Sequence, residues 1–168
     1  MIFIPSNAGN YTKGRDGHAI TRGYFHRTAV KGDTALGEAN RSHNVCVKAS
    51  YYIVIDLDGN AIESTLSTDT EWAVDEWDEN EISVSYEFTG LNGTPLTAKQ
   101  IATAIKVIKA DKAVKKIANH RLTISEIPPR KVSGWANHHD ITTAYKIAGG
   151  HTDGISEAEI SQILAGIK

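Results

Sequence analysis

The chain has 168 residues, of which 40% are hydrophobic and 23% are charged, and its formal net charge is -2. This length and composition are typical of one globular domain, so we expect residues 1–168 to form a single domain. The small net charge gives no indication of nucleic-acid binding. The single cysteine excludes an internal disulfide, and no apolar run is long enough to cross a membrane.

The charged residues are unevenly distributed along the sequence. Residues 69–81 contain seven acids and no lysine or arginine, whereas bases dominate residues 99–131. We interpret these runs as a solvated acidic loop and a solvated basic helix face. The alternative is an electrostatic field that steers a charged polymer towards the protein.

The first half of the chain contains signals for strands and one short helix. A short strand is expected over 23–30 and a short helix over 33–44. Residues 51–55 are rich in β-branched and aromatic side chains, which is typical of a strand. The Asp-Gly pair at 58–59 is a strong hairpin signal, and it predicts a second strand over 61–63.

Residues 81–88 alternate between apolar and polar side chains, which predicts another strand. One face of this strand carries the apolar residues Ile82, Val84, Tyr86 and Phe88. Glu87 falls on the opposite face with two serines.

Two helices are expected in the second half of the chain. Thr97 and Gln100 match a capping box at the start of a helix over 97–118. Ser156 and Glu159 match a second box before the last helix. Strands mixed with helices, without regular alternation, indicate an α/β fold with a sheet covered by helices.

Several histidines lie in contexts that could serve chemistry, namely His26, His138, His139 and His151. A catalytic zinc ion takes three protein ligands and leaves a fourth position open, and imidazole and carboxylate both suit it. Asp153 supplies a carboxylate near the last of these histidines. From the residues alone, surface or hydrogen-bonded histidines and a plain loop acid near a helix start are the favoured interpretation, and a metal site is the alternative.

Six short segments of the sequence are similar, in the same order, to the motifs of a known protein family. They are Phe25-His26-Arg27-Thr28-Ala29, residues 50–59, residues 81–88, Leu96-Thr97-Ala98-Lys99-Gln100, Asn137-His138-His139-Asp140-Ile141 and His151-Thr152-Asp153-Gly154. Each is similar to a motif of the type-2 N-acetylmuramoyl-L-alanine amidases, which include peptidoglycan recognition proteins and many phage endolysins. The resemblance implies an α/β fold with a central mixed sheet flanked by helices. It also implies Zn²⁺-dependent hydrolysis of the amide bond between N-acetylmuramic acid and L-alanine in peptidoglycan, by a single catalytic domain.

The resemblance implies that the zinc ligands are His26, His138 and Asp153. His139 replaces His138 if the register slips by one residue. His151 is the rival of Asp153, and in that case the aspartate would orient one of three histidine ligands.

The same resemblance assigns catalytic roles to Glu87, Tyr51 and His151. Glu87 stands at the family's strand glutamate and would transfer the proton from water to the leaving amine. Tyr51 would donate a hydrogen bond, and His151 would steady the oxyanion. The alternatives are a solvated strand residue for Glu87 and a core or rim residue for Tyr51.

The sequence departs from the family pattern at three places. Asn137 stands where the family has glycine, and Gly154 stands where it has proline. The Trp-His pair that usually precedes the glutamate strand is Trp72-Ala73 here.

Other functions remain open from the sequence. They are a non-catalytic peptidoglycan-binding module of the same fold, an unrelated zinc hydrolase and a domain without a site. The start of the chain lacks the features of a secretory signal, which favours a phage endolysin, with a cytoplasmic muropeptide-recycling amidase as the alternative. We expect a monomer that remains in the cytoplasm until it is released to the cell wall and binds peptidoglycan. We expect no nucleic-acid partner and no stable membrane association.

Overall fold

The computed structural model describes residues 1–168 and contains a mixed six-stranded sheet of order β1-β5-β4-β7-β3-β8. In that order the strands are β1 (Ile2–Phe3), β5 (Ala61–Glu63), β4 (Ile53–Ile55), β7 (Ser83–Phe88), β3 (Arg22–Arg27) and β8 (Gly134–Asn137). Strand β3 runs parallel to both of its neighbours, whereas β4 and β5 are antiparallel. A separate small sheet pairs β2 (Tyr11–Thr12) with β6 (Thr70–Glu71).

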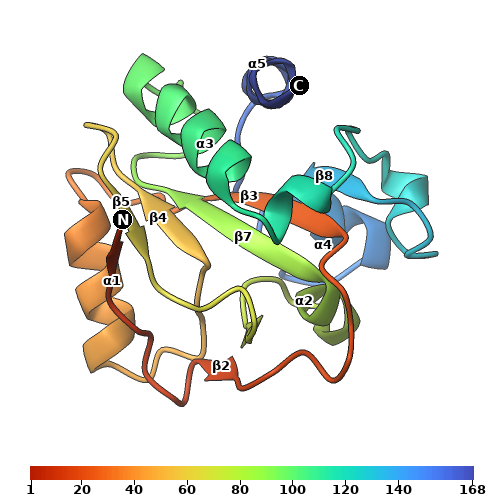
Figure 1. Cartoon of the computed structure of the whole chain (residues 1–168), viewed down its shortest axis with the longest axis horizontal. Helices are drawn as coiled ribbons and strands as arrows, with labels where there is room; N and C mark the ends of the chain where they lie inside the picture. Colours follow the sequence, from red (N-terminus) through yellow and green to blue (C-terminus); the bar gives the residue numbers. More distant parts are fainter.

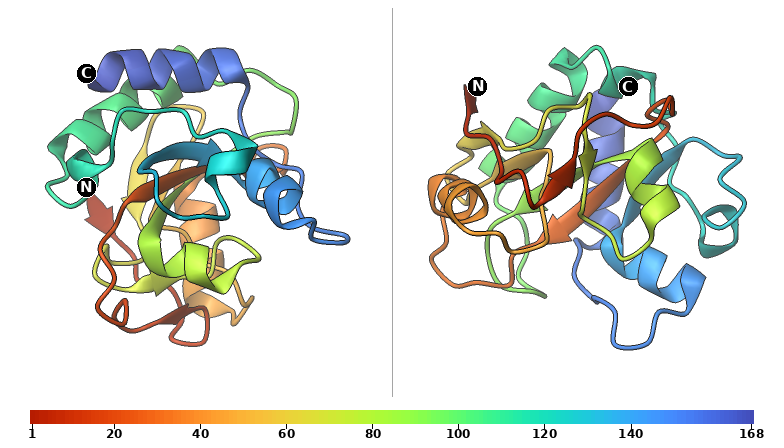
Figure 2. Two further views of the ribbon diagram at one scale, coloured as in Figure 1. Left: turned by 90° about the vertical axis from the view of Figure 1, so that its right-hand side faces the viewer. Right: turned by 90° about the horizontal axis from the view of Figure 1, so that it is seen from below.

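Helices cover both faces of the large sheet. They are α1 (Ala35–Asn44), α2 (Trp77–Ile82), α3 (Ala98–Ala110), α4 (His138–Tyr145) and α5 (Glu157–Ile167), with 3-10 turns η1 (Val114–Lys116) and η2 (Ile124–Glu126). Helices α3 and α5 lie together over one face, and α1, α2 and α4 lie towards the other (Figures 1 and 2). The expected mixed sheet flanked by helices is therefore confirmed. None of these helices combines the length and the apolar character needed to span a bilayer.

The main core lies between the sheet and the pair α3–α5. Phe25 stacks on Trp135 with ring centroids 5.3 Å apart, and both side chains are fully buried. Gly23 permits this packing, since a Cβ at that position would lie 2.2 Å from the Trp135 ring. The sheet face opposite this core is the one that carries the polar residues described below.

Most local signals in the sequence are confirmed. Strands β4 and β5 form the expected hairpin, with Gly59 in the left-handed region at φ 80°. Helix α1 lies within the expected range 33–44. Both capping boxes are present, at the starts of α3 and α5.

The helix expected over 97–118 is shorter than the sequence suggested. It ends at Ala110, because the Asp111 carboxylate accepts a hydrogen bond from the backbone N–H of Ala113 at 2.8 Å. The chain then forms the 3-10 turn η1, which buries Val114 completely. Aspartate competes with the helix for backbone hydrogen bonds in this way, so it ends the helix eight residues early.

Two strand boundaries also differ from expectation. Ile82 ends helix α2, so β7 begins at Ser83. Strand β3 ends at Arg27 rather than continuing to residue 30, since Ala29 adopts a left-handed conformation with φ 56°. Every residue of both strands is buried, because helices and loops cover the polar face as well as the apolar one.

The acidic run at 69–81 is not the solvated loop that we expected. Glu79 is fully buried and accepts two hydrogen bonds from the Arg22 guanidinium, both 2.7 Å long. Glu71 is also buried, and one of its oxygens lies 3.7 Å from Nη2 of Arg15. Buried carboxylates require such partners, and here the partners come from distant parts of the chain.

Candidate metal centre

Three separate segments bring a buried histidine–histidine–aspartate cluster together. His26 lies near the end of β3, and His138 is the first residue of α4, directly after β8. Because β3 and β8 are parallel neighbours, their carboxyl ends meet at the same edge of the sheet. Asp153 reaches this edge from the loop before α5. The ligand atoms of the three residues all lie within 4.8 Å of one another, and all three side chains are buried.

The Asp153 carboxylate lies between the two imidazoles. Its Oδ1 is 3.0 Å from Nδ1 of His138, and its Oδ2 is 3.5 Å from Nδ1 of His26. The histidine ring centroids are 4.7 Å apart. Nε2 of each histidine is buried without a hydrogen-bond partner. Such orphaned polar atoms are costly unless they bind something, and this donor set of two imidazoles and one carboxylate fits a zinc ion.

The electrostatics of the cluster agree with metal binding. Burial lowers the pKa of His26 to about 4, although the hydrogen bond with Asp153 opposes this shift. Burial alone would raise the pKa of Asp153, but the hydrogen bonds from His138 and His26 outweigh it and hold that pKa well below its usual range. Near neutral pH the imidazole of His26 is therefore neutral and the carboxylate is ionised, which are the forms that bind metals.

Glu87 lies beside the cluster without being part of it. Strand β7 places it in register with His26 on one side and with Val54 on the other. Its side chain is buried and Oε1 has no hydrogen-bond partner, so the solvated alternative is wrong. Burial and the nearby Asp153 raise the pKa of Glu87 well above its usual value, while a hydrogen bond with Tyr51 lowers it. A bound cation would lower that pKa further.

Tyr51 and His151 complete the surroundings of the cluster. The Tyr51 ring meets the His26 ring edge-on, with centroids 5.5 Å apart. The His151 ring stacks on the His138 ring at 4.8 Å, and its side chain is exposed. Both residues line the groove described below.

His139, the alternative to His138, lies outside the cluster. Its side chain is exposed, and its backbone N–H donates a 3.1 Å hydrogen bond to the carbonyl oxygen of Asp153. Successive helix residues point in directions about 100° apart, so only one member of the pair can face the cluster.

A groove of about 960 Å³ runs past the cluster. Tyr51, His138 and Asp153 form part of its wall, whereas His26 and Glu87 are buried and do not. Further along, the wall includes Lys48, whose ammonium lies 5.6 Å from the centroid of the Trp72 ring. The cluster is thus accessible from the groove through His138 and Asp153.

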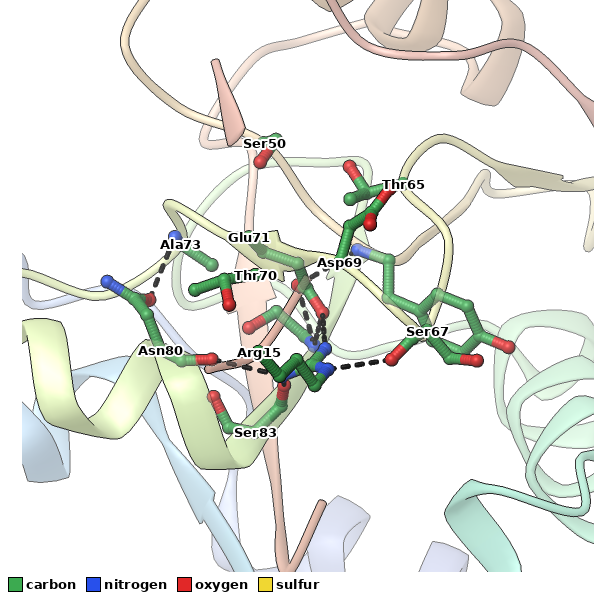
Figure 3. A network of polar contacts seen from close by, with 12 residues as sticks. Arg15, Ser50, Thr65, Ser67, Asp69, Thr70, Glu71, Ala73, Asn80 and Ser83 are labelled. Carbon is green, nitrogen blue, oxygen red and sulfur yellow. Dashed lines mark hydrogen bonds and ion pairs between the residues drawn. The ribbon is translucent and has the colours of Figure 1, made fainter. Parts of the chain in front are cut away.

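A buried polar network fixes one wall of this groove, the segment 72–75. Asn80 accepts hydrogen bonds from the backbone N–H groups of Ala73 and Val74, at 3.1 Å and 2.9 Å. Arg15 in turn donates to the carbonyl oxygens of Asn80 and of several neighbours (Figure 3). This network could not be predicted from the sequence, because the hydrogen-bond partners of Arg15 are more than 50 residues away from it.

Several solved structures of known proteins share this fold. The fold is similar to that of the Staphylococcus aureus hydrolase AmiA in complex with its ligand, with a TM-score of 0.69 and 14% identity over 99% of this chain and 82% of that one. It is also similar to the N-acetylmuramoyl-L-alanine amidase LysC from Clostridium intestinale, with a TM-score of 0.60 and 12% identity over 98% of each chain. A mutant endolysin from Bacillus subtilis gives a TM-score of 0.61 and 18% identity, over 99% of this chain and 97% of that one. At these identities the likeness shows the fold alone.

The family comparison is more specific. No curated protein sequence matches the chain significantly. The family model described as N-acetylmuramoyl-L-alanine amidase, however, matches residues 15–155, a span that includes every residue of the cluster. The chain therefore belongs to the N-acetylmuramoyl-L-alanine amidase family.

Proposed function

We propose that the protein is a zinc-dependent enzyme that hydrolyses the amide bond between N-acetylmuramic acid and L-alanine in peptidoglycan. The observation that carries this proposal is the convergence of buried His26, His138 and Asp153, whose ligand atoms lie within 4.8 Å of one another, beside a groove in an amidase fold. Each of these residues would supply one ligand atom to the ion. Zinc, when bound, supplies Lewis acidity that activates water and polarises the carbonyl group of the substrate.

The proton transfers fall to Glu87. Its unpartnered oxygen is suited to accept a proton from the attacking water and to deliver it to the nitrogen of the departing L-alanine. Tyr51 lies near this carboxylate and in this role would donate a hydrogen bond to it. The buried position of Glu87 excludes bulk water, so the proton passes to the leaving group rather than to solvent.

His151 is the proposed stabiliser of the developing oxyanion. It stacks on His138 with its Nδ1 3.6 Å from Oδ1 of Asp153, and its exposed ring also lines the groove. From there it can donate a hydrogen bond to a carbonyl oxygen of a substrate that lies in the groove.

The biological role that we propose is that of a phage endolysin. Solved structures described as endolysins are among those that share the fold. In this role the protein would act as a monomer that stays in the cytoplasm until it reaches the cell wall. A cytoplasmic muropeptide-recycling amidase is the alternative, and a non-catalytic peptidoglycan-binding module is less favoured because the ligand set is complete.

Purified sacculi and soluble muropeptides together test this proposal. With sacculi, we expect new α-amino groups from L-alanine to appear without new reducing sugar ends. Treatment with a chelator should abolish this release, and added zinc should restore it. Binding to sacculi without release would indicate a receptor. Release from soluble muropeptides alone would instead favour the recycling role.

A further inference from the structure

Asn137 occupies the junction between β8 and α4, directly before the proposed ligand His138. It is the last residue of the strand and the N-cap of the helix. Its backbone N–H donates a 2.8 Å hydrogen bond to Oδ2 of Asp140, which completes a capping box. Nη2 of Arg121 also lies 2.8 Å from that oxygen. The carboxylate that accepts the backbone N–H of Asn137 is therefore itself fixed by an ion pair.

The side chain of Asn137 is buried and forms hydrogen bonds with the loop that carries Asp153. Its Nδ2 donates to the carbonyl oxygen of Ile155 at 2.8 Å, and its Oδ1 accepts from the N–H of Ile155 at 3.0 Å. On the other side of Gly154, the carbonyl oxygen of Asp153 accepts from the N–H of His139. Hydrogen bonds at Asp153 and at Ile155, the two neighbours of Gly154, thus connect the loop to the start of α4.

Both the backbone conformation and the close packing at Gly154 require a residue without a side chain. Its φ of 153° lies in the region that favours glycine. A Cβ at this position would lie 2.7 to 2.8 Å from atoms of the Asn137 side chain. The asparagine and the glycine therefore depend on each other, since the close approach of the loop leaves no room for a side chain between them.

Asp153 needs such support more than the other two proposed ligands. His26 and His138 are held by a strand and a helix, whereas residues 151–156 have no regular secondary structure. Beyond its contacts with the histidines, the Asp153 carboxylate accepts only the backbone N–H of Arg27, at 3.2 Å. The position of this carboxylate therefore depends on how the adjoining main chain is held.

We propose that Asn137 is a positioning residue that sets the Asp153 carboxylate for metal binding, and that Gly154 is required because Asn137 holds the loop so closely. This inference rests on the proposed function only in taking zinc as the metal. Groups that orient metal ligands typically contribute about 10- to 100-fold to metal affinity. A purely structural asparagine would contribute to folding stability and leave zinc affinity unchanged.

The test is the zinc dissociation constant of the full chain, measured by competition with a chelating dye. For Asn137→Ala we expect binding about 10- to 100-fold weaker than in the wild type. The isosteric variant Asn137→Asp replaces the donor to Ile155 by a second carboxylate oxygen, and it should weaken zinc binding as well. Thr97→Ala, which removes a comparable cap from α3 away from the cluster, is the matched control and should bind zinc normally.

The coupling of the two residues provides a second readout. Gly154→Ala should weaken zinc binding less in the Asn137→Ala background than in the wild type, since the close contacts with Cγ and Oδ1 of Asn137 are absent there, while the 2.8 Å contact with Cβ and the backbone strain remain. Zinc affinities of both Asn137 variants within twofold of the wild type would overturn the inference and leave the proposed function intact. A wild-type protein that binds no zinc would contradict both.

Discussion

The Glu87→Gln variant is expected to bind zinc like the wild type and to lose about 10²- to 10⁴-fold in kcat on sacculi. Glutamine keeps the shape of the side chain and its place in β7, but it cannot carry a proton from water to the leaving amine. Because Glu87 is not one of the clustered ligand residues, the zinc content should not change. Turnover, KM and zinc content measured on one preparation separate these effects.

Folding stability should not fall in this variant. Burial raises the pKa of Glu87, which means that the charged form is disfavoured at this position in the metal-free protein. A neutral amide of equal size avoids that penalty. Glu63→Gln is a suitable control, since Glu63 is a partly buried strand glutamate on β5 outside the groove wall. Normal turnover in Glu87→Gln would show that another group moves the proton.

The His26→Ala variant is expected to lose both zinc and activity. It removes one of three proposed ligands, and the two that remain cannot complete a catalytic site that needs three protein ligands and an open position. Zinc content after dialysis should fall to the background, and release of stem peptides should fall with it. Chemical denaturation in excess chelator should show that the metal-free variant still folds cooperatively.

His139→Ala provides the matched control for this experiment. The two histidines lie near the same sheet edge, but the His139 side chain is exposed and contributes only its backbone N–H to the Asp153 loop. This variant should retain zinc and activity. If His139→Ala lost zinc and His138→Ala kept it, the ligand assignment would move by one residue.

Much of the local structure could be predicted because its signals are local. The Asp-Gly turn, the two capping boxes and the alternation in β7 each involve residues within a few positions of one another. The helix over 97–118 was too long in the prediction because its apolar spacing continues past Asp111. The side chain of that residue ends the helix, and the apolar pattern alone does not reveal it.

The polar contacts across the fold could not be predicted in this way. Arg22 and Glu79 are 57 residues apart, so nothing in the acidic run indicated that its carboxylates would be buried. The alternation placed Glu87 on the polar face of its strand, but only the fold shows that this face is covered. Likewise, the capping pattern from Asn137 to Asp140 could have been predicted from the sequence, whereas the hydrogen bond from the Asn137 side chain to Ile155 could not.

The choice between the paired histidines was also beyond the sequence. It depends on where α4 begins, because a shift of one residue would turn a different imidazole towards His26. The family resemblance favoured His138, and the structure places His138 in the cluster with His26 and Asp153.

A crystal of the zinc-loaded protein, with anomalous diffraction recorded at the zinc absorption edge, tests the metal centre most directly. We expect a single strong peak, about 2.0–2.1 Å from a nitrogen of His26 and of His138 and about 2.0–2.2 Å from an oxygen of Asp153, with one further position open. A peak bound by His139 or His151 in place of these residues, or no peak at this edge of the sheet, would contradict it.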